Sequence, residues 1–205
     1  MAQSETPVIE TVMRSEPSLV GITAFRMDYA SKHNRSVSLQ KRGAGVIIHP
    51  SGLIITNVHT IYNSNKITVE LSDKTQLPAE IVNVLPDYDL ALIRVTPASP
   101  LVPIAMGNSD QVKLGDRVIN VGHSWLLNKT ISGGVVVGLG HRIEGNEKKI
   151  EFIKVDMELY KGDSGGPLLD EKGRLIGLIM ATVLKSDKSL LAIATNRLLE
   201  LSGEY

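Results

Sequence analysis

Short apolar runs separated by turn residues dominate this chain, and their rhythm is the strongest constraint on its fold. The first half holds six such runs: Leu19–Phe25, Ala44–His49, Leu53–Asn57, Lys66–Leu71, Leu77–Val84 and Leu90–Val95. The second half holds six more: Arg117–Gly122, Lys129–Val137, Ile150–Asp156, Pro167–Leu169, Leu175–Thr182 and Leu190–Ala194. Runs of this length, bounded by Gly, Pro, Asn, Asp and Ser, predict β-strands in closed barrels or sandwiches.

A stretch that contains Pro97, Pro100 and Pro103 separates the two series. The chain is therefore predicted to be all-β, and two small all-β units that meet at a cleft would fit this pattern. Pro7–Ser15 has apolar residues at helical spacing, and Asn196–Leu201 has the pattern of a short helix. We expect a short helix at each end of the chain.

The composition argues against several classes of protein. Lys and Arg number 22 and Asp and Glu also number 22, so nucleic acid and anionic membranes are not predicted as main partners. The basic stretch Lys32–Arg42 is interpreted as a solvated loop. No stretch reaches the roughly 18 apolar residues that a membrane span requires. Cysteine is absent, which excludes disulfides and thiolate metal sites. The N-terminus lacks a signal-peptide pattern, so the protein either stays where it is made or has lost its leader.

One glycine-rich segment, Gly162–Pro167, has the sequence Gly-Asp-Ser-Gly-Gly-Pro. Such a segment forms a turn rather than a regular helix or strand. Ser164 on this turn would have an exposed hydroxyl, and the neighbouring N–H groups would be free to meet an oxyanion. An ordinary hairpin turn explains the segment alone about equally well. The rest of the chain has to distinguish the two interpretations.

The positions of the histidines restrict the order in which a Ser–His–Asp triad could occur in this chain. They are His33, His49, His59, His123 and His141, and all of them precede Ser164. This order excludes the Ser–Asp–His arrangement of α/β-hydrolases. A subtilisin-like pairing of Asp28 with His59 conflicts with the all-β rhythm. The order His, Asp, Ser stays open.

His59 follows an apolar strand, and Asp89 directly precedes another. A carboxylate at the start of an apolar strand is costly to bury without a partner, and an imidazole N–H is a suitable one. Taken singly, each residue is more readily explained as structural. Together with Ser164, in this order, they predict a catalytic triad.

Three segments resemble the signature segments of trypsin-like serine proteases, most of all those of the HtrA (Deg) branch: Thr56–His59, Asp89–Ile93 and Gly162–Pro167. Further segments extend the resemblance over nearly the whole chain from about Ser15: Gly43–Ile48, Met106–Ser109, Leu114–Asp116, Thr130–Val136 and Ala192–Asn196. The resemblance implies a single protease domain over residues 1–205 with two six-stranded antiparallel β-barrels, as in chymotrypsin and trypsin. The first barrel is expected over about residues 17–98 and the second over about 104–195, with the active site between them.

By position, the resemblance implies that Ser164 is the nucleophile, His59 the general base and then acid, and Asp89 the residue that orients the imidazole. The N–H groups of Gly162 and Ser164 would form the oxyanion hole, with Asp163 assisting. The implied activity is that of a serine endopeptidase that cleaves unfolded or misfolded proteins or peptides through an acyl-enzyme. No cofactor and no metal are implied.

The same resemblance predicts the substrate pocket. Glu158 holds the position at which an acidic residue gives trypsin its preference for Lys and Arg. The HtrA branch usually has a small residue there and prefers small or medium aliphatic side chains. The apolar candidates for the pocket wall are Leu159, Ile179, Met180 and Ile193. We expect apolar specificity, with basic specificity as the alternative if Glu158 faces the pocket rather than solvent.

Some positions depart from the branch. Asp163 replaces its usual asparagine, and because no activation junction is present we expect this carboxylate to be solvated or locally hydrogen-bonded. His123–Trp125 and Tyr160–Lys161 differ in loops that regulate activity in the family. A protease-fold scaffold or regulatory binding protein with little turnover is therefore the alternative function. The family association implies a periplasmic or organellar compartment and a homotrimer. No PDZ domain, frequent in this branch, is expected in this chain.

Overall fold

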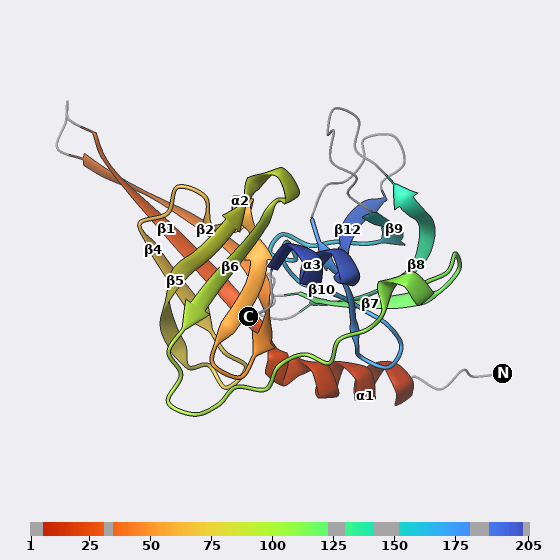
Figure 1. Cartoon of the computed structure of the whole chain (residues 1–205). Helices are drawn as coiled ribbons and strands as arrows, with labels where there is room; N and C mark the ends of the chain where they lie inside the picture. Colours follow the sequence, from red (N-terminus) through yellow and green to blue (C-terminus); the bar gives the residue numbers. More distant parts are fainter. Residues whose placement is uncertain (1–5, 31–34, 123–129, 142–151, 181–188, 203–205) are drawn as a thin grey trace.

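The computed structural model describes residues 6–30, 35–122, 130–141, 152–180 and 189–202. The strands form two closed barrels of six strands each, and all the named strand pairs are antiparallel. The barrels lie side by side, the first coloured red-orange to yellow-green and the second green to blue (Figure 1). The predicted fold class is confirmed.

The first barrel contains the strands of the N-terminal half. They are β1 (Leu19–Ala30), β2 (Arg35–His49), β3 (Leu53–Asn57), β4 (Lys66–Glu70), β5 (Gln76–Leu85) and β6 (Leu90–Val95). Their order around the barrel is β1-β2-β3-β6-β5-β4, and β1 pairs with β4 to close it.

The second barrel repeats this plan in the C-terminal half. Its strands are β7 (Arg117–Gly122), β8 (Thr130–His141), β9 (Phe152–Met157), β10 (Pro167–Leu169), β11 (Leu175–Ile179) and β12 (Leu190–Ala194). Their order is β10-β11-β12-β9-β8-β7, with β10 paired to β7.

Strands β3 and β6 form the wall between the barrels, and both are buried on two faces. Ile54 and Ile93 pair across these strands and point into the core of the first barrel. Their neighbours Ile55 and Leu92 also pair, and they belong to a cluster that includes Leu178 of the second barrel. Burial on both faces explains why these strands are continuous apolar runs instead of alternating ones.

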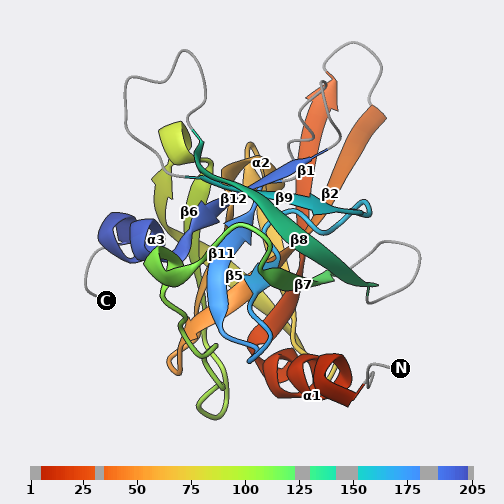
Figure 2. The same cartoon turned by 90° about the vertical axis from the view of Figure 1, so that its right-hand side faces the viewer.

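Short helices lie at both ends and at the strand junctions. The α-helices are α1 (Thr6–Ser15), α2 (Val58–Ile61) and α3 (Thr195–Ser202), and the 3₁₀ helices are η1 (Glu16–Ser18), η2 (Pro86–Tyr88) and η3 (Ser109–Gln111). Helix α1 lies along one end of the second barrel (Figure 2). Its Thr11 hydroxyl donates a hydrogen bond of 2.7 Å to the Glu171 carbonyl. None of the helices in the described ranges is long and apolar enough to cross a membrane.

Strands β1 and β2 are longer than the sequence predicted. They were expected at Leu19–Phe25 and Ala44–His49, but Arg26–Ala30 and Arg35–Leu39 also pair with each other. Pairing between β1 and β4 stops at Phe25, so the added residues form a two-stranded ribbon that projects from the barrel (Figure 1). Apolar residues alternate with polar ones in both segments, at Met27 and Tyr29 and at Val37 and Leu39, and the prediction overlooked this strand pattern.

Because β6 packs between the two barrels, we expect Leu92→Ala to lower the free energy of unfolding considerably. Leu92 is 1% exposed and packs in the cluster shared by the barrels, so its truncation would leave a cavity. We expect a loss of about 2–4 kcal/mol in the free energy of unfolding, measured by urea denaturation. The matched control Leu114→Ala removes a side chain that is 65% exposed and should change stability by less than about 0.5 kcal/mol. Equal effects of the two substitutions would contradict this account of the wall.

Candidate active site

His59 lies on α2, the single helical turn that follows β3. Its imidazole Nδ1 is 2.6 Å from Asp89 Oδ2, and its backbone N–H donates to Asp89 Oδ1 at 2.9 Å. A carboxylate oxygen accepts hydrogen bonds, so Nδ1 is the donor in this contact and Nε2 takes no part in it. The His59 side chain is 48% exposed, which leaves Nε2 accessible to a substrate.

Asp89 also holds the start of α2 through its backbone. Its carbonyl accepts hydrogen bonds from the Val58 N–H at 3.1 Å and from the Asn57 side-chain amide at 3.0 Å. The pairing of Asn57 with Leu90 brings the two segments together. Asp89 itself has a left-handed conformation (φ 49°), which aspartate tolerates better than most residues and which ends η2.

Ser164 lies in the loop between β9 and β10 of the second barrel. The Ser164 carbonyl accepts a hydrogen bond of 2.8 Å from the Ala44 N–H of the first barrel. A Cβ atom on Gly165 would lie 2.3 Å from the Ala44 carbonyl oxygen, and its φ of 79° also favours glycine. The glycines of this motif therefore let the serine loop approach the first barrel closely.

The same approach brings Ser164 near α2. A Cβ atom on Gly43 would lie 2.7 Å from the Thr60 methyl group and 3.0 Å from the Ser164 carbonyl oxygen. Thr60 follows His59 directly, so the serine loop and the histidine helix meet at Gly43. Within the described residues His59 and Ser164 make no direct hydrogen bond. The structure thus joins His59 to Asp89 and places Ser164 beside them on the opposite barrel.

Asp163 is fully buried directly before the serine. Its carboxylate accepts hydrogen bonds from the Thr130 hydroxyl at 2.7 Å and the Tyr160 N–H at 2.8 Å. Burial raises the pKa of this carboxyl, because removal from water disfavours the charged form, and the two hydrogen bonds oppose the shift. Of the two expected environments, local hydrogen bonding is present and solvation is not.

The residues that accommodate Asp163 were not predicted as functional. A Cβ atom on Gly122 would lie 1.7 Å from Asp163 Oδ1, so only glycine fits there. Thr130 was noted only as part of a family-like strand, and its hydroxyl is buried against the carboxylate. No local pattern links these residues to Asp163, because they lie more than 30 positions away in sequence.

The predicted oxyanion-hole donors differ in their partners. The Asp163 N–H donates to the Tyr160 carbonyl at 3.1 Å, so it closes a turn. The N–H groups of Gly162 and Ser164 have no hydrogen-bond partner among the described residues. Gly162 has a φ of 109°, a backbone conformation that favours glycine. Gly162 and Ser164 remain available as donors to a bound group.

The residues predicted for the substrate pocket differ in how far they are buried. Ile179 and Ile193 are fully buried in the core clusters of the second barrel. Met180 is 9% exposed, Leu159 is half-buried, and Glu158 is exposed. Residues 181–188, which follow Met180, lie outside the described residues, as do His33 and His123–Trp125.

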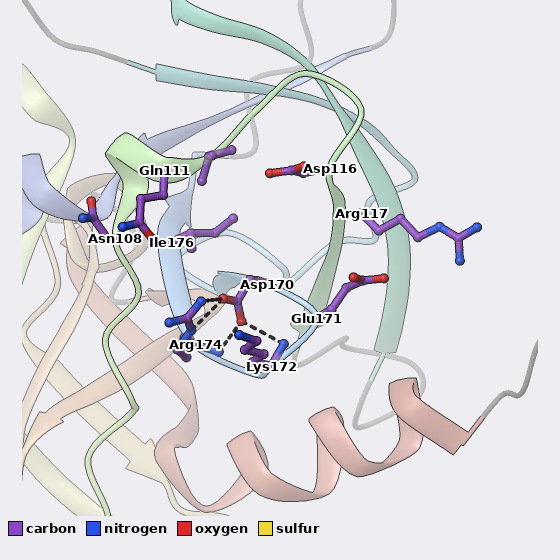
Figure 3. A pocket seen from close by; sticks show the side chains of 10 residues that line it. Asn108, Gln111, Asp116, Arg117, Asp170, Glu171, Lys172, Arg174 and Ile176 are labelled. Carbon is purple, nitrogen blue, oxygen red and sulfur yellow. Dashed lines mark hydrogen bonds and ion pairs between the residues drawn. The ribbon is translucent and has the colours of Figure 1, made fainter.

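A cavity of about 250 Å³ opens on the second barrel near α1, and neither His59 nor Asp89 lines it (Figure 3). It is lined by Asn108, Gln111, Val112, Asp116, Arg117, Asp170, Glu171, Lys172, Arg174 and Ile176. Asp170 accepts hydrogen bonds from the Arg174 side chain at 2.6 and 2.7 Å and from two backbone N–H groups. This carboxylate is already satisfied, and no nucleophile–base pair lines the cavity. The described residues contain no cluster of three acidic or histidine side chains that could hold a metal ion.

A His–Asp pair on one six-stranded barrel and a serine loop on the next define the chymotrypsin-like class of protein. Residues 43–178 match the model of the trypsin-like peptidase domain, and the chain belongs to this family.

Curated relatives and solved structures agree with this assignment. The chain is similar to a probable periplasmic serine endoprotease DegP-like from Pseudomonas fulva (strain 12-X), with 34% identity over 144 residues, 70% of this chain and 30% of the relative. The relative of the same description from Brucella suis biovar 1 (strain 1330) is 34% identical over 159 residues, 77% of this chain and 30% of the relative. The chain thus spans about 30% of the length of these relatives.

Among solved structures, the HtrA-type protease AlgW with tripeptide has a TM-score of 0.83 and 27% identity, over 95% of this chain and 62% of that chain. AlgW with decapeptide has the same TM-score and 25% identity, over 95% of this chain and 66% of that one. The predicted resemblance to the HtrA branch is therefore confirmed.

The buried Asp163 predicts a pH-dependent stability difference between wild type and Asp163→Asn. The folded-state pKa is raised above the ordinary aspartate value of 3.8, so this carboxyl favours folding at low pH and loses that contribution as pH rises through its folded pKa. Asparagine keeps an acceptor for the Tyr160 N–H and a donor for the Thr130 hydroxyl. We expect Asp163→Asn to gain stability relative to wild type as pH increases from 4 to 7, measured by urea denaturation.

Asp73→Asn is the control, and its stability difference from wild type should stay nearly constant from pH 4 to 7. A hydrogen bond from the Thr75 N–H lowers the pKa of the Asp73 carboxyl, so its contribution is present above the ordinary aspartate value of 3.8 and is lost only as pH falls through the folded pKa. Asp163→Leu should cost about 1–3 kcal/mol, because it leaves the Tyr160 N–H and the Thr130 hydroxyl unpaired. A constant difference between Asp163→Asn and wild type across this pH range would refute the account of Asp163.

Proposed function

We propose that this protein is a serine endopeptidase of the HtrA/Deg type that cleaves unfolded or misfolded proteins through an acyl-enzyme. The observation that carries the proposal is the double hydrogen bond of Asp89 to His59, at 2.6 Å to the ring and 2.9 Å to the backbone. This pair lies where the first barrel also binds the Ser164 loop through Ala44. The family assignment and the AlgW structures with bound peptides support the same activity.

The chemistry follows from the available atoms. His59 Nε2 takes the proton of Ser164 Oγ as that oxygen bonds to the peptide carbonyl carbon. The carbonyl π electrons move to its oxygen, and the N–H groups of Gly162 and Ser164 stabilise the resulting negative charge. Asp89 stabilises the positive charge that develops on the imidazole.

The tetrahedral intermediate then collapses. The carbon–nitrogen bond breaks, and the leaving amine takes the proton from His59 Nε2. The acyl group stays on Ser164 Oγ as an ester. Water attacks this ester after giving a proton to His59, and the proton returns to Ser164 as the acid product leaves.

The proposal extends to specificity, location and assembly. Ile179 and Ile193 are core residues, so we assign the apolar contacts to Leu159 and Met180. Exposed Glu158 supports apolar over basic specificity, because its charge is solvated. The periplasmic names of the relatives support an extracytoplasmic location. We also propose a homotrimer from the family resemblance.

A protease-fold scaffold with little turnover is the second candidate. It is favoured by one observation, the lack of a direct hydrogen bond between His59 and Ser164 among the described residues. This hydrogen bond is often long in free enzymes and shortens when substrate binds. The two candidates therefore differ in whether the serine reacts.

Covalent labelling separates the two functions. We expect a fluorophosphonate probe to add once to the wild-type protein, because Nε2 activates Ser164 as a nucleophile, and to leave Ser164→Ala unlabelled. Intact mass spectrometry measures the adduct, with unfolded casein present in parallel samples. Ser189→Ala, which removes a buried serine elsewhere, is the control and should label like wild type. A wild-type protein without adduct under both conditions would support the scaffold.

The Asp89–His59 pair predicts the effect of Asp89→Asn. The amide would favour the imidazole tautomer that carries its proton on Nε2, so the base would be lost while the geometry remains. We expect kcat on fluorescent casein to fall about 10³- to 10⁴-fold with little change in KM. Asp87→Asn, two residues away on the exposed η2, is the matched control and should retain most activity. Equal activity of both variants would exclude Asp89 as the orienting residue.

A further inference from the structure

Lys41 contacts the C-terminal end of the helix that carries His59. Its Nζ donates hydrogen bonds of 3.1 Å to the carbonyl oxygens of His59 and Tyr62. The same ammonium group lies 5.6 Å from the centroid of the Tyr62 ring. We infer that Lys41 is a positioning residue, which holds α2 and thereby directs the imidazole of His59 toward Ser164.

Helix α2 needs support from outside because it is one turn long. A helix of four residues is not stable alone, and the carbonyls of its last turn have no partner within the helix. Within α2, the Tyr62 N–H donates to the Val58 carbonyl at 2.7 Å. The carbonyls of His59 and Tyr62 then point out of this end of the helix toward Lys41.

Two sets of hydrogen bonds, which we call clamps, hold α2 from its opposite ends. Asp89 binds its start through the Val58 N–H and the His59 N–H. Lys41 binds its end, where a positive charge also interacts favourably with the helix dipole. His59 lies between the clamps, so a change at either end alters the direction of its ring.

Strand β2 couples this clamp to the nucleophile. Lys41 and Ala44 are three residues apart on β2, and the Ala44 N–H binds the Ser164 carbonyl. One strand of the first barrel therefore contacts both the histidine helix and the serine loop. Loss of the Lys41 hydrogen bonds would let α2 move relative to Ser164, and displacements of about 1 Å can reduce a rate about 100-fold.

Because of its position, we expect removal of the Lys41 side chain to affect α2 and the His59 ring rather than the stability of the whole fold. Its side chain is exposed, and exposed ionic contacts contribute little to the free energy of unfolding. The effect should appear in the catalytic rate and in the environment of the His59 ring, with a small change in melting temperature. This inference rests on the proposed role of His59 as the general base.

The test compares Lys41→Met, Lys41→Arg and Lys74→Met. Methionine removes the donors and the charge, whereas arginine keeps both and can bind two carbonyls. Lys74→Met is the matched control, because it removes an exposed ion pair with Glu70 on the same barrel away from α2. The readouts are kcat and KM on fluorescent casein, the rate of fluorophosphonate labelling, and the NMR resonances of the His59 ring.

We expect Lys41→Met to reduce kcat and the labelling rate about tenfold, with KM within about twofold and a melting temperature within about 2 °C of wild type. The His59 ring resonances should shift in Lys41→Met and not in Lys74→Met. Lys41→Arg should restore most of the rate. The NMR readout requires no turnover, so it tests the clamp even in a protein with little activity.

The outcomes separate this inference from the proposed function. Wild-type rates and unshifted His59 resonances in Lys41→Met would overturn the clamp, while loss of labelling in His59→Ala would keep the protease proposal. Full labelling of His59→Ala would instead overturn the role of His59 as base. A large drop in melting temperature that Lys41→Arg does not reverse would assign Lys41 a stabilising role and also overturn the inference.

Discussion

Asp89 forms the interaction on which the rest of the candidate site depends. Its backbone carbonyl and its carboxylate together accept hydrogen bonds from Asn57, Val58 and His59, so one residue holds the end of β3, the start of α2 and the imidazole. A residue that accepts four hydrogen bonds from three residues needs a defined conformation, and the left-handed backbone of Asp89 at the end of η2 supplies it. The position of the His59 imidazole is therefore a consequence of how β3 and β6 pair.

The pairing of these strands also explains why the site lies between the barrels. Both faces of β3 and β6 are apolar, since one face fills the first barrel and the other packs against the second. The C-terminal end of β3 leads to His59, and Asp89 directly precedes the start of β6. The second barrel supplies Ser164 at the same junction, where Gly43 and Gly165 permit contact between backbones that any side chain would separate. The proposed nucleophile and the proposed base thus lie on separate barrels that share one hydrophobic cluster.

Buried polar groups set the shape of the serine loop. Asp163 lies in the second barrel with the Thr130 hydroxyl and the Tyr160 N–H as its partners, and its own N–H closes the turn that precedes Ser164. A carboxylate at this depth lowers the stability of the folded chain at neutral pH, because burial opposes its ionisation. Its hydrogen bonds order the loop that presents the Gly162 and Ser164 N–H groups. The Asp163 side chain therefore lowers the stability of the fold and at the same time orders the loop that carries Ser164.

The sequence by itself determined the two series of short strands, the order of His59, Asp89 and Ser164, and the strand junctions on which they lie. These features are local, because strand period, turn residues and glycine content are properties of neighbouring residues. The tertiary structure alone decided which long-range partners each residue has. Lys41 lies in a stretch that was interpreted as a solvated loop, yet it binds α2, and Ile179 and Ile193 are core residues although they were predicted to line the pocket. Such contacts depend on how strands distant in sequence are registered and packed, which no local pattern encodes.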